Sequence, residues 1–289
     1  VPSEENAHKF IRFEIEESNS MSCVGSYGRL RDMLGIPLMP LMTIYDFFVK
    51  RALDQHFYNL YWKSSFIMVG TPAGVTLSPE GAQHGWKSDF QIPNQITWEP
   101  FYCQELDFIL SDAIKRHLTF DNEGRSGVHI RTVTRGAEQK DLIKFLRSQS
   151  RFKEDKNALL HHKDFPVEGA ANEKEVSAIS DTEIMDVFKK EVLAGAYYLI
   201  DYRGYAGYVP GDNVVNIFSM GSPTTEAIKA SQQLLSRGIY ANVIVITSSD
   251  LIAGNLAHEN DYDYLKNYIG INANLYVGSD SVQTPAEYQ

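Results

Sequence analysis

Apolar runs alternate with segments of helical periodicity along the first half of the chain. The expected strands are the short alternating piece 9–16, the runs 36–44 and 66–69, and the segments 92–98 and 127–134. The expected helices are 20–34, 46–62 and 100–117, the last with Pro100 in its first turn. Strands that alternate with helices of this length predict an α/β fold with a mostly parallel sheet covered on both faces.

The second half of the chain repeats this pattern on a smaller scale. A capping box, Ser180 to Glu183, predicts the start of a helix that runs to about 193. Strands are expected at 197–202, 214–219 and 241–247, and a helix from Ser222 and Pro223 to Gly238 completes a βαβ unit.

The segment between the two halves is rich in lysine and arginine, which is typical of a solvated linker, and it has room for one helix. We therefore expect two mostly parallel-sheet domains. They are residues 1–137 and 177–289, joined by a linker at 138–176, and the second domain has too few strands to be complete.

Composition and charge argue against several classes of protein. The chain of 289 residues is 43% hydrophobic and carries a formal net charge of -10, which argues against nucleic acid or an anionic membrane as a partner. No run approaches the roughly 18 apolar residues of a membrane helix. Cys23 and Cys103 form no CxxC or zinc spacing, so we expect reduced, buried thiols and a cytoplasmic protein. The start, VPSEENAHKF, has no methionine and no signal-peptide pattern, so we expect a fragment, a processed product or one subunit of a larger enzyme.

Polar and aromatic candidates follow three of the expected strands. Glu17 follows the first, Tyr45 and Phe48 follow the second, and the loop with Glu80 and His84 follows the third. The carboxyl ends of parallel strands share one edge of a sheet, so these groups can converge there. A carboxylate, an aromatic wall and an imidazole describe a pocket for a planar heterocycle with proton transfer nearby.

Each candidate also has an ordinary structural interpretation. Glu17 is equally typical of a helix start, where the dipole favours a carboxylate. Tyr45, Phe47 and Phe48 are typical of a core, and His84 of a hydrogen-bonded loop.

Three motifs add a family resemblance. FEIEESN (13–19), TIYDFFVKRALD (43–54) and VGTPAGVTLSPEGAQH (69–84), in this order, resemble the pyrimidine-binding domain of the thiamine-diphosphate enzymes of the transketolase superfamily. The homodimeric type of pyruvate dehydrogenase E1 component is the most similar. Residues 92–117 resemble the same domain, and residues 214–251 resemble the C-terminal domain of the superfamily.

The resemblance implies roles for the candidates. Glu17 matches the glutamate that hydrogen-bonds N1′ of the cofactor aminopyrimidine and so promotes removal of the thiazolium C2 proton. Tyr45 and Phe48 match residues that wall the pyrimidine, with Phe47 as the alternative if the register shifts by one. His84 matches a histidine that reaches the substrate as a proton donor or charge stabiliser.

The family's GDG…N motif, which holds the diphosphate and Mg²⁺, has no counterpart here. We interpret PGDN (210–213) as a turn and expect no metal ligands in the chain. The cofactors thiamine diphosphate and Mg²⁺ would then be held partly by a domain absent from this chain. The chain would therefore be inactive as an isolated fragment.

The expected function is that of a pyruvate dehydrogenase E1, an oxidoreductase that decarboxylates pyruvate and transfers the acyl group to a lipoyl group. The implied partners are a second copy in a homodimer and an E2 lipoyl-bearing acyltransferase. Two alternatives stay open: another superfamily activity, such as ketol transfer or acetoin cleavage, and a non-catalytic dimerisation or regulatory module. The sequence leaves open which 2-oxo acid and which acyl acceptor are used.

Overall fold

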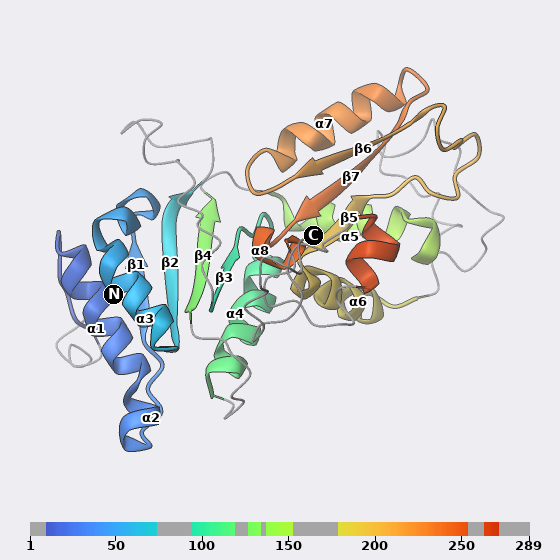
Figure 1. Cartoon of the computed structure of the whole chain (residues 1–289). Coiled ribbons are helices and arrows are strands. Elements are labelled where there is room, and N and C mark those ends of the chain that lie inside the picture. Colours follow the sequence, from blue (N-terminus) through green and yellow to red (C-terminus); the bar gives the residue numbers. More distant parts are fainter. Residues whose placement is uncertain are drawn as a thin grey trace, which may run out of the picture.

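The computed structural model describes residues 10–73, 94–118, 127–133, 137–152, 179–253 and 263–271 (Figure 1). In this part of the chain two sheets lie one after the other, with helices around them. Sheet A has the strand order β1-β2-β4-β3 and sheet B the order β5-β7-β6. The predicted α/β fold with mostly parallel sheets is confirmed.

Sheet A is parallel throughout. Its strands are β1 (Leu41–Ile44), β2 (Phe66–Ala73), β3 (Gln95–Trp98) and β4 (Gly127–Val133). Because all described strands of sheet A run the same way, their carboxyl ends lie along one edge, which is where the sequence predicts chemistry.

The two faces of sheet A are covered by different helices. Phe66 and Met68 of β2 pack into the core beneath α1 (Glu17–Gly28), the 3-10 helix η2 (Asp46–Ala52) and α3 (Leu53–Tyr61). Ile67 points to the opposite face, where it joins the core with α4 (Cys103–Leu118). The short helix α2 (Leu30–Leu34) follows α1.

Sheet B is mixed. Strands β6 (Val214–Ser219) and β7 (Tyr240–Ile246) are parallel and linked by α7 (Thr224–Leu235), which confirms the βαβ unit. Strand β5 (Ala196–Ile200) is antiparallel to β7. The remaining elements are α5 (Gln139–Ser148), η4 (Ser150–Phe152), α6 (Asp181–Ala194), α8 (Ser249–Ile252) and the π-helix η7 (Tyr264–Ile269). The start of α6 is the predicted capping box, with both reciprocal hydrogen bonds between Ser180 and Glu183.

The two sheets share a hydrophobic core. One cluster of buried side chains includes Ile96 and Ile130 of sheet A together with Tyr197 and Val243 of sheet B. The edge strand β3 also bonds to the second half of the chain, because the Thr97 N–H donates to Asp250 Oδ2 over 2.6 Å and the Glu99 N–H donates to the Thr247 carbonyl over 2.9 Å. These bonds satisfy backbone donors that an edge strand would otherwise expose.

Helix α5 lies within the segment predicted as a linker, and it packs against β5 and α6. The boundaries at 137 and 177 stay predictions. The turn predicted at 210–213 is confirmed, since Gly211 has a φ of 85° there and the Asp212 N–H donates to the Val209 carbonyl.

Three details of the sequence prediction were wrong. Residues 10–16 form no strand, because Glu14 has a φ of 56°, which an extended strand does not allow. The helix predicted at 20–34 starts earlier, at Glu17, and is divided after Gly28; a Cβ there would lie 2.3 Å from the Ser65 carbonyl oxygen. Neither thiol is buried as predicted, because Cys103 is exposed at the start of α4 and Cys23 is half-buried in α1. Both thiols are free, and the cytoplasmic location stays a prediction.

Candidate functional site

Glu17 occupies the N-terminus of α1, where backbone N–H groups and the helix dipole stabilise a carboxylate. Its side chain is 14% exposed and accepts a hydrogen bond from Arg51 Nη1 over 3.2 Å. The next residue, Ser18, donates its hydroxyl to the Arg51 carbonyl over 2.8 Å, so α1 and the end of η2 are joined at this point. The predicted carboxylate therefore lies beside the segment that carries the predicted aromatic wall.

The aromatic wall is formed where β1 ends and η2 begins. Tyr45 is 50% exposed, and its ring meets that of Phe48 edge to face with centroids 5.7 Å apart. The Arg51 guanidinium carbon lies 3.8 Å from the centre of the Phe48 ring. Phe47 is instead covered by Lys50, whose Nζ lies 4.8 Å from the ring centre. The structure thus links Glu17 to Phe48 through Arg51.

Next to this wall lies a buried charged cluster, in which Arg131 forms ion pairs with Asp46 and Glu99, and His129 contacts Asp46. Arg131 is 2% exposed and binds Asp46 through Nε and Nη2, the latter 2.9 Å from Oδ2. Its Nη1 lies 2.5 Å from Glu99 Oε2, and His129 Nε2 lies 3.2 Å from Asp46 Oδ1. One guanidinium therefore holds two buried carboxylates from different loops.

The charge state of Asp46 follows from its partners. Burial alone would raise the pKa of Asp46, but its contact with His129 and its hydrogen bonds and ion pair with Arg131 outweigh burial and hold the pKa below its usual value. The carboxyl group of Asp46 is consequently ionised in the folded protein. Its ion pair with Arg131 holds the backbone between Tyr45 and Phe47.

Sequence reasoning missed this charged cluster. The signal was the strand GVHIRTV, in which His129 and Arg131 alternate with the apolar Val128 and Ile130. Two polar residues two positions apart in a buried strand share one face of the sheet, so they require partners there.

Gly70 allows the cluster to form. It follows Val69 in β2, and a Cβ at this position would lie 2.6 Å from Asp46 Oδ1 and 2.8 Å from His129 Nε2. The glycine that ends the apolar run in the sequence is therefore required by close packing of the charged side chains.

A histidine lies further along the same polar face. His56 of α3 is 1% exposed and hydrogen-bonds Gln95 through Nε2 over 2.6 Å. Burial lowers the pKa of His56 to about 4, against the hydrogen bond to Gln95, which raises it. His56 is therefore neutral, and its hydrogen bond to Gln95 holds α3 against β3.

Arg51 joins two of the predicted site residues. Its planar guanidinium contacts both Glu17 and Phe48.

Several expectations lie beyond these residues. Glu80 and His84 are outside the described part of the chain. Among the described residues no group of three or more His, Cys, Asp or Glu side chains is placed to hold a metal ion. Nor does any described helix have the length and apolar character needed to cross a membrane.

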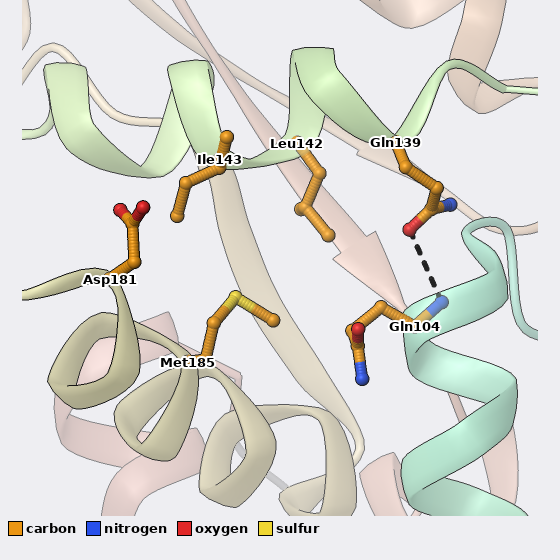
Figure 2. Close-up of a pocket in the computed structure, with 6 residues that line it drawn as sticks. All are labelled: Gln104, Gln139, Leu142, Ile143, Asp181 and Met185. Atoms are coloured by element: carbon orange, nitrogen blue, oxygen red, sulfur yellow. Dashed lines mark hydrogen bonds between the residues drawn. The ribbon is translucent and has the colours of Figure 1, made fainter.

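A separate hollow lies between α4, α5 and α6 (Figure 2). Its volume is about 270 Å³ and its lining is mixed: Gln104, Gln139, Leu142, Ile143, Asp181 and Met185. The Gln104 N–H donates to Gln139 Oε1 over 3.3 Å across one end. Among the described residues, Glu17, Tyr45, Phe47 and Phe48 do not line this hollow, so it is distinct from the site at Glu17.

A search against protein-family models gives no match. A segment of the chain is 32% identical over 90 residues to the pyruvate dehydrogenase E1 component of Buchnera aphidicola subsp. Baizongia pistaciae (strain Bp), covering 28% of this chain and 10% of that protein.

Among solved structures, the transketolase of Leishmania mexicana matches 86% of this chain and 28% of its own length, with a TM-score of 0.51 and 16% identity. The transketolase of Campylobacter jejuni subsp. jejuni NCTC 11168 matches 83% of this chain and 28% of its own length, with a TM-score of 0.49 and 13% identity. The similarity to the Leishmania mexicana structure shows a transketolase-like fold. The chain spans only a tenth of the length of the Buchnera protein and 28% of the length of each of these two transketolases.

Proposed function

We propose that this chain supplies the pyrimidine-binding half of a thiamine-diphosphate site in a 2-oxo acid dehydrogenase E1. The complete protein would decarboxylate pyruvate and transfer the acyl group to the lipoyl group of an E2 acyltransferase. The observation that carries the proposal is the arrangement of Glu17 and Phe48 around one planar N–H donor. The sequence similarity to the Buchnera E1 component supports the choice of reaction, and the transketolase-like fold supports the wider class of enzyme.

Glu17 has the central role in this proposal. Its carboxylate lies in the first turn of α1, where it accepts a hydrogen bond from N1′ and holds the proton there. Bound thiamine diphosphate supplies a carbon nucleophile that adds to the carbonyl group of a 2-oxo acid. Glu17 acts on the cofactor and does not touch the substrate.

The aromatic residues orient the ring. Tyr45 and Phe48 present apolar surface at the end of β1, which excludes water from one face of a bound heterocycle. Asp46 lies between them in the sequence and is bound by Arg131, which holds the backbone that carries both aromatic rings. Phe47, already covered by Lys50, is the less suitable wall residue. His84 remains our proposal for the proton donor near the substrate.

Exposed apolar surface supports the proposal about partners. Large hydrophobic side chains are exposed on the helices α1 to α3 and strand β1 or directly beside them, among them Ile15, Met33, Leu34, Leu41, Tyr61 and Trp62. Exposed apolar surface of this extent is typical of an interface. We propose that a second copy of the protein in a homodimer covers it and that the domain holding the diphosphate and Mg²⁺ lies nearby. Residues 1–137 would be the pyrimidine-binding domain and 177–289 the C-terminal domain.

A substrate screen tests this proposal. The complete protein, with thiamine diphosphate and Mg²⁺, is given a panel of 2-oxo acids and a lipoyl domain as acceptor, and CO₂ release is measured. Pyruvate turnover that needs both the cofactor and the lipoyl domain supports the proposal. Turnover of ketose phosphates alone would identify ketol transfer instead, and no cofactor-dependent reaction with any donor would favour a non-catalytic module.

A further inference from the structure

The turn before α7 packs directly against Glu99, which follows strand β3. A Cβ added to Gly221 would lie 2.2 Å from Glu99 Oε1 and 3.0 Å from Glu99 Cγ and Cδ. Figure 1 shows this turn, between β6 and α7, beside the carboxyl ends of sheet A. Glu99 is buried, so the turn limits the space that its carboxylate can occupy. The position of the Glu99 side chain therefore depends on the second sheet.

The second half of the chain also holds the backbone of Glu99. The Glu99 N–H donates to the carbonyl of Thr247, which follows β7, over 2.9 Å. Two residues earlier in the chain, the Thr97 N–H donates to Asp250 Oδ2 over 2.6 Å. Both the backbone and the side chain of Glu99 are thus placed by residues that belong to the second sheet or follow it.

One guanidinium joins Glu99 to Asp46. Arg131 Nη1 lies 2.5 Å from Glu99 Oε2, and Arg131 Nη2 lies 2.9 Å from Asp46 Oδ2. A guanidinium is planar and rigid, and this one is buried, so a shift of Glu99 either moves the group or breaks one of its ion pairs. Asp46 belongs to the turn in which the Phe48 N–H donates to the Tyr45 carbonyl over 2.8 Å. The two aromatic rings are therefore connected to the second sheet through buried contacts.

We propose that Glu99 is a positioning residue, through which the turn between β6 and α7 sets the conformation of the predicted aromatic wall, Tyr45 and Phe48. Glu99 acts on the wall through Arg131 and Asp46. A displacement of the turn in the second sheet therefore changes the wall in the first. The effect on cofactor binding rests on the proposed function, because it takes the two rings as contacts of the pyrimidine.

Substitution of Gly221 displaces Glu99 without touching the wall. The methyl group of Gly221→Ala would overlap the Glu99 carboxylate, which must then move. Residues along a network of contacts change binding at a distant site by about 2- to 30-fold. We therefore expect Gly221→Ala to weaken thiamine diphosphate binding by about 2- to 30-fold. It should also speed the exchange of the backbone N–H groups of residues 45–48, because such exchange reports local opening.

Gly211→Ala is the matched control. Both glycines have a positive φ, 57° at Gly221 and 85° at Gly211, so an alanine is strained at either position. Apart from its chain neighbours, a Cβ at Gly211 meets no atom of the described residues within 4 Å, so this variant adds backbone strain without a new contact. Glu99→Ala completes a double-mutant cycle, because it removes the side chain that the new methyl group displaces.

The test compares the complete wild-type protein with Gly221→Ala, Gly211→Ala, Glu99→Ala and the double variant Gly221→Ala, Glu99→Ala. Hydrogen–deuterium exchange of residues 45–48 is measured without ligand, and thiamine diphosphate affinity is measured by calorimetry with Mg²⁺. We expect Gly221→Ala to change both quantities and Gly211→Ala to change neither. In the Glu99→Ala background, Gly221→Ala should have no further effect. If Glu99→Ala does not fold, Glu99→Asp takes its place, because it withdraws the carboxylate from the turn by one methylene group.

Two results would overturn the inference. One is exchange at residues 45–48 or cofactor affinity in Gly221→Ala that equals the wild-type value. The other is an effect of Gly221→Ala that is the same with and without the Glu99 side chain. Neither result bears on whether the cofactor binds. If the exchange changes as expected but the wild type does not bind the cofactor, the proposed function fails, and the connection from the turn through Glu99 to residues 45–48 is supported.

Discussion

Arg131 of β4 binds Asp46 of η2 through two of its nitrogen atoms, although 85 residues separate them in the sequence. The same guanidinium reaches Glu99, whose carboxylate lies against Gly221, the turn before α7; a Cβ on Gly221 would be 2.2 Å from Glu99 Oε1. This relationship ties the proposed cofactor wall to the second sheet. The two buried carboxylates also share one buried cation.

Loss of the Arg131 guanidinium should destabilise the folded protein strongly. Arg131→Met leaves two buried carboxylates without their partner, so we expect it to lower the free energy of unfolding by about 3 to 5 kcal/mol. The triple variant Arg131→Met, Asp46→Asn, Glu99→Gln removes the stranded charges and should recover part of this loss. Urea denaturation followed by circular dichroism measures both. Equal stability of Arg131→Met and the wild type would contradict the role given to the cluster.

Close packing at Gly70 leads to a second prediction. Gly70→Ala places a methyl group 2.6 Å from Asp46 Oδ1, so Asp46 or β2 must shift, and we expect a destabilisation of about 1 to 3 kcal/mol. Gly127→Ala on the adjacent strand is the matched control, because its methyl group meets the flexible end of Leu60 first. Thermal unfolding should show the larger fall in Tm for Gly70→Ala. A larger fall for the control would show that the carboxylate can move away easily.

Glu105 predicts a pH dependence. It is fully buried between the two sheets, where Tyr197 donates to Oε1 and the Phe101 N–H donates to Oε2 over 2.6 Å. Burial raises the pKa of Glu105 from 4.5 to about 7, although these hydrogen bonds lower it. In the unfolded chain the carboxyl group ionises at lower pH than in the folded protein.

The folded state is therefore penalised as pH rises from about 4.5 to 7, and the penalty is constant above that range. At 1.36 kcal/mol per pKa unit it amounts to about 3 kcal/mol at pH 8. Glu105→Gln cannot ionise, so its stability relative to the wild type should improve by about that amount between pH 4.5 and 8. The measurement is chemical denaturation of both proteins at a series of pH values. A difference that does not change with pH would disprove the raised pKa.

Local patterns in the sequence predicted the elements of the fold well. The βαβ unit of sheet B and the capping box at Ser180 depend on residues close together in the chain, and both are present. The segment 9–16 shows the limit of such patterns. Alternation favours a strand only where a partner strand pairs with it, and the left-handed backbone at Glu14 turns the chain away.

The candidate site was predictable in part. Tyr45 and Phe48 follow a strand as predicted, whereas the strand expected before Glu17 is absent. The structure still brings Glu17 and Phe48 together through Arg51, and their roles stay predictions. Neither Arg51 nor Arg131 was singled out, because an arginine reveals its partners only when distant segments are brought together. A long side chain of this kind has no preferred neighbour in the sequence.

The central claim is that Glu17 activates thiamine diphosphate, and one comparison of rates tests it directly. Cofactor-dependent decarboxylation of pyruvate is measured in the complete protein for the wild type, Glu17→Gln and the adjacent control Glu16→Gln, whose side chain is exposed and bonded only to Asn19 among the described residues. Positioned acid–base groups contribute about 100- to 10,000-fold to rates, so Glu17→Gln should lose at least about 100-fold while remaining folded. The control should keep the wild-type rate. Wild-type turnover by Glu17→Gln would contradict the claim.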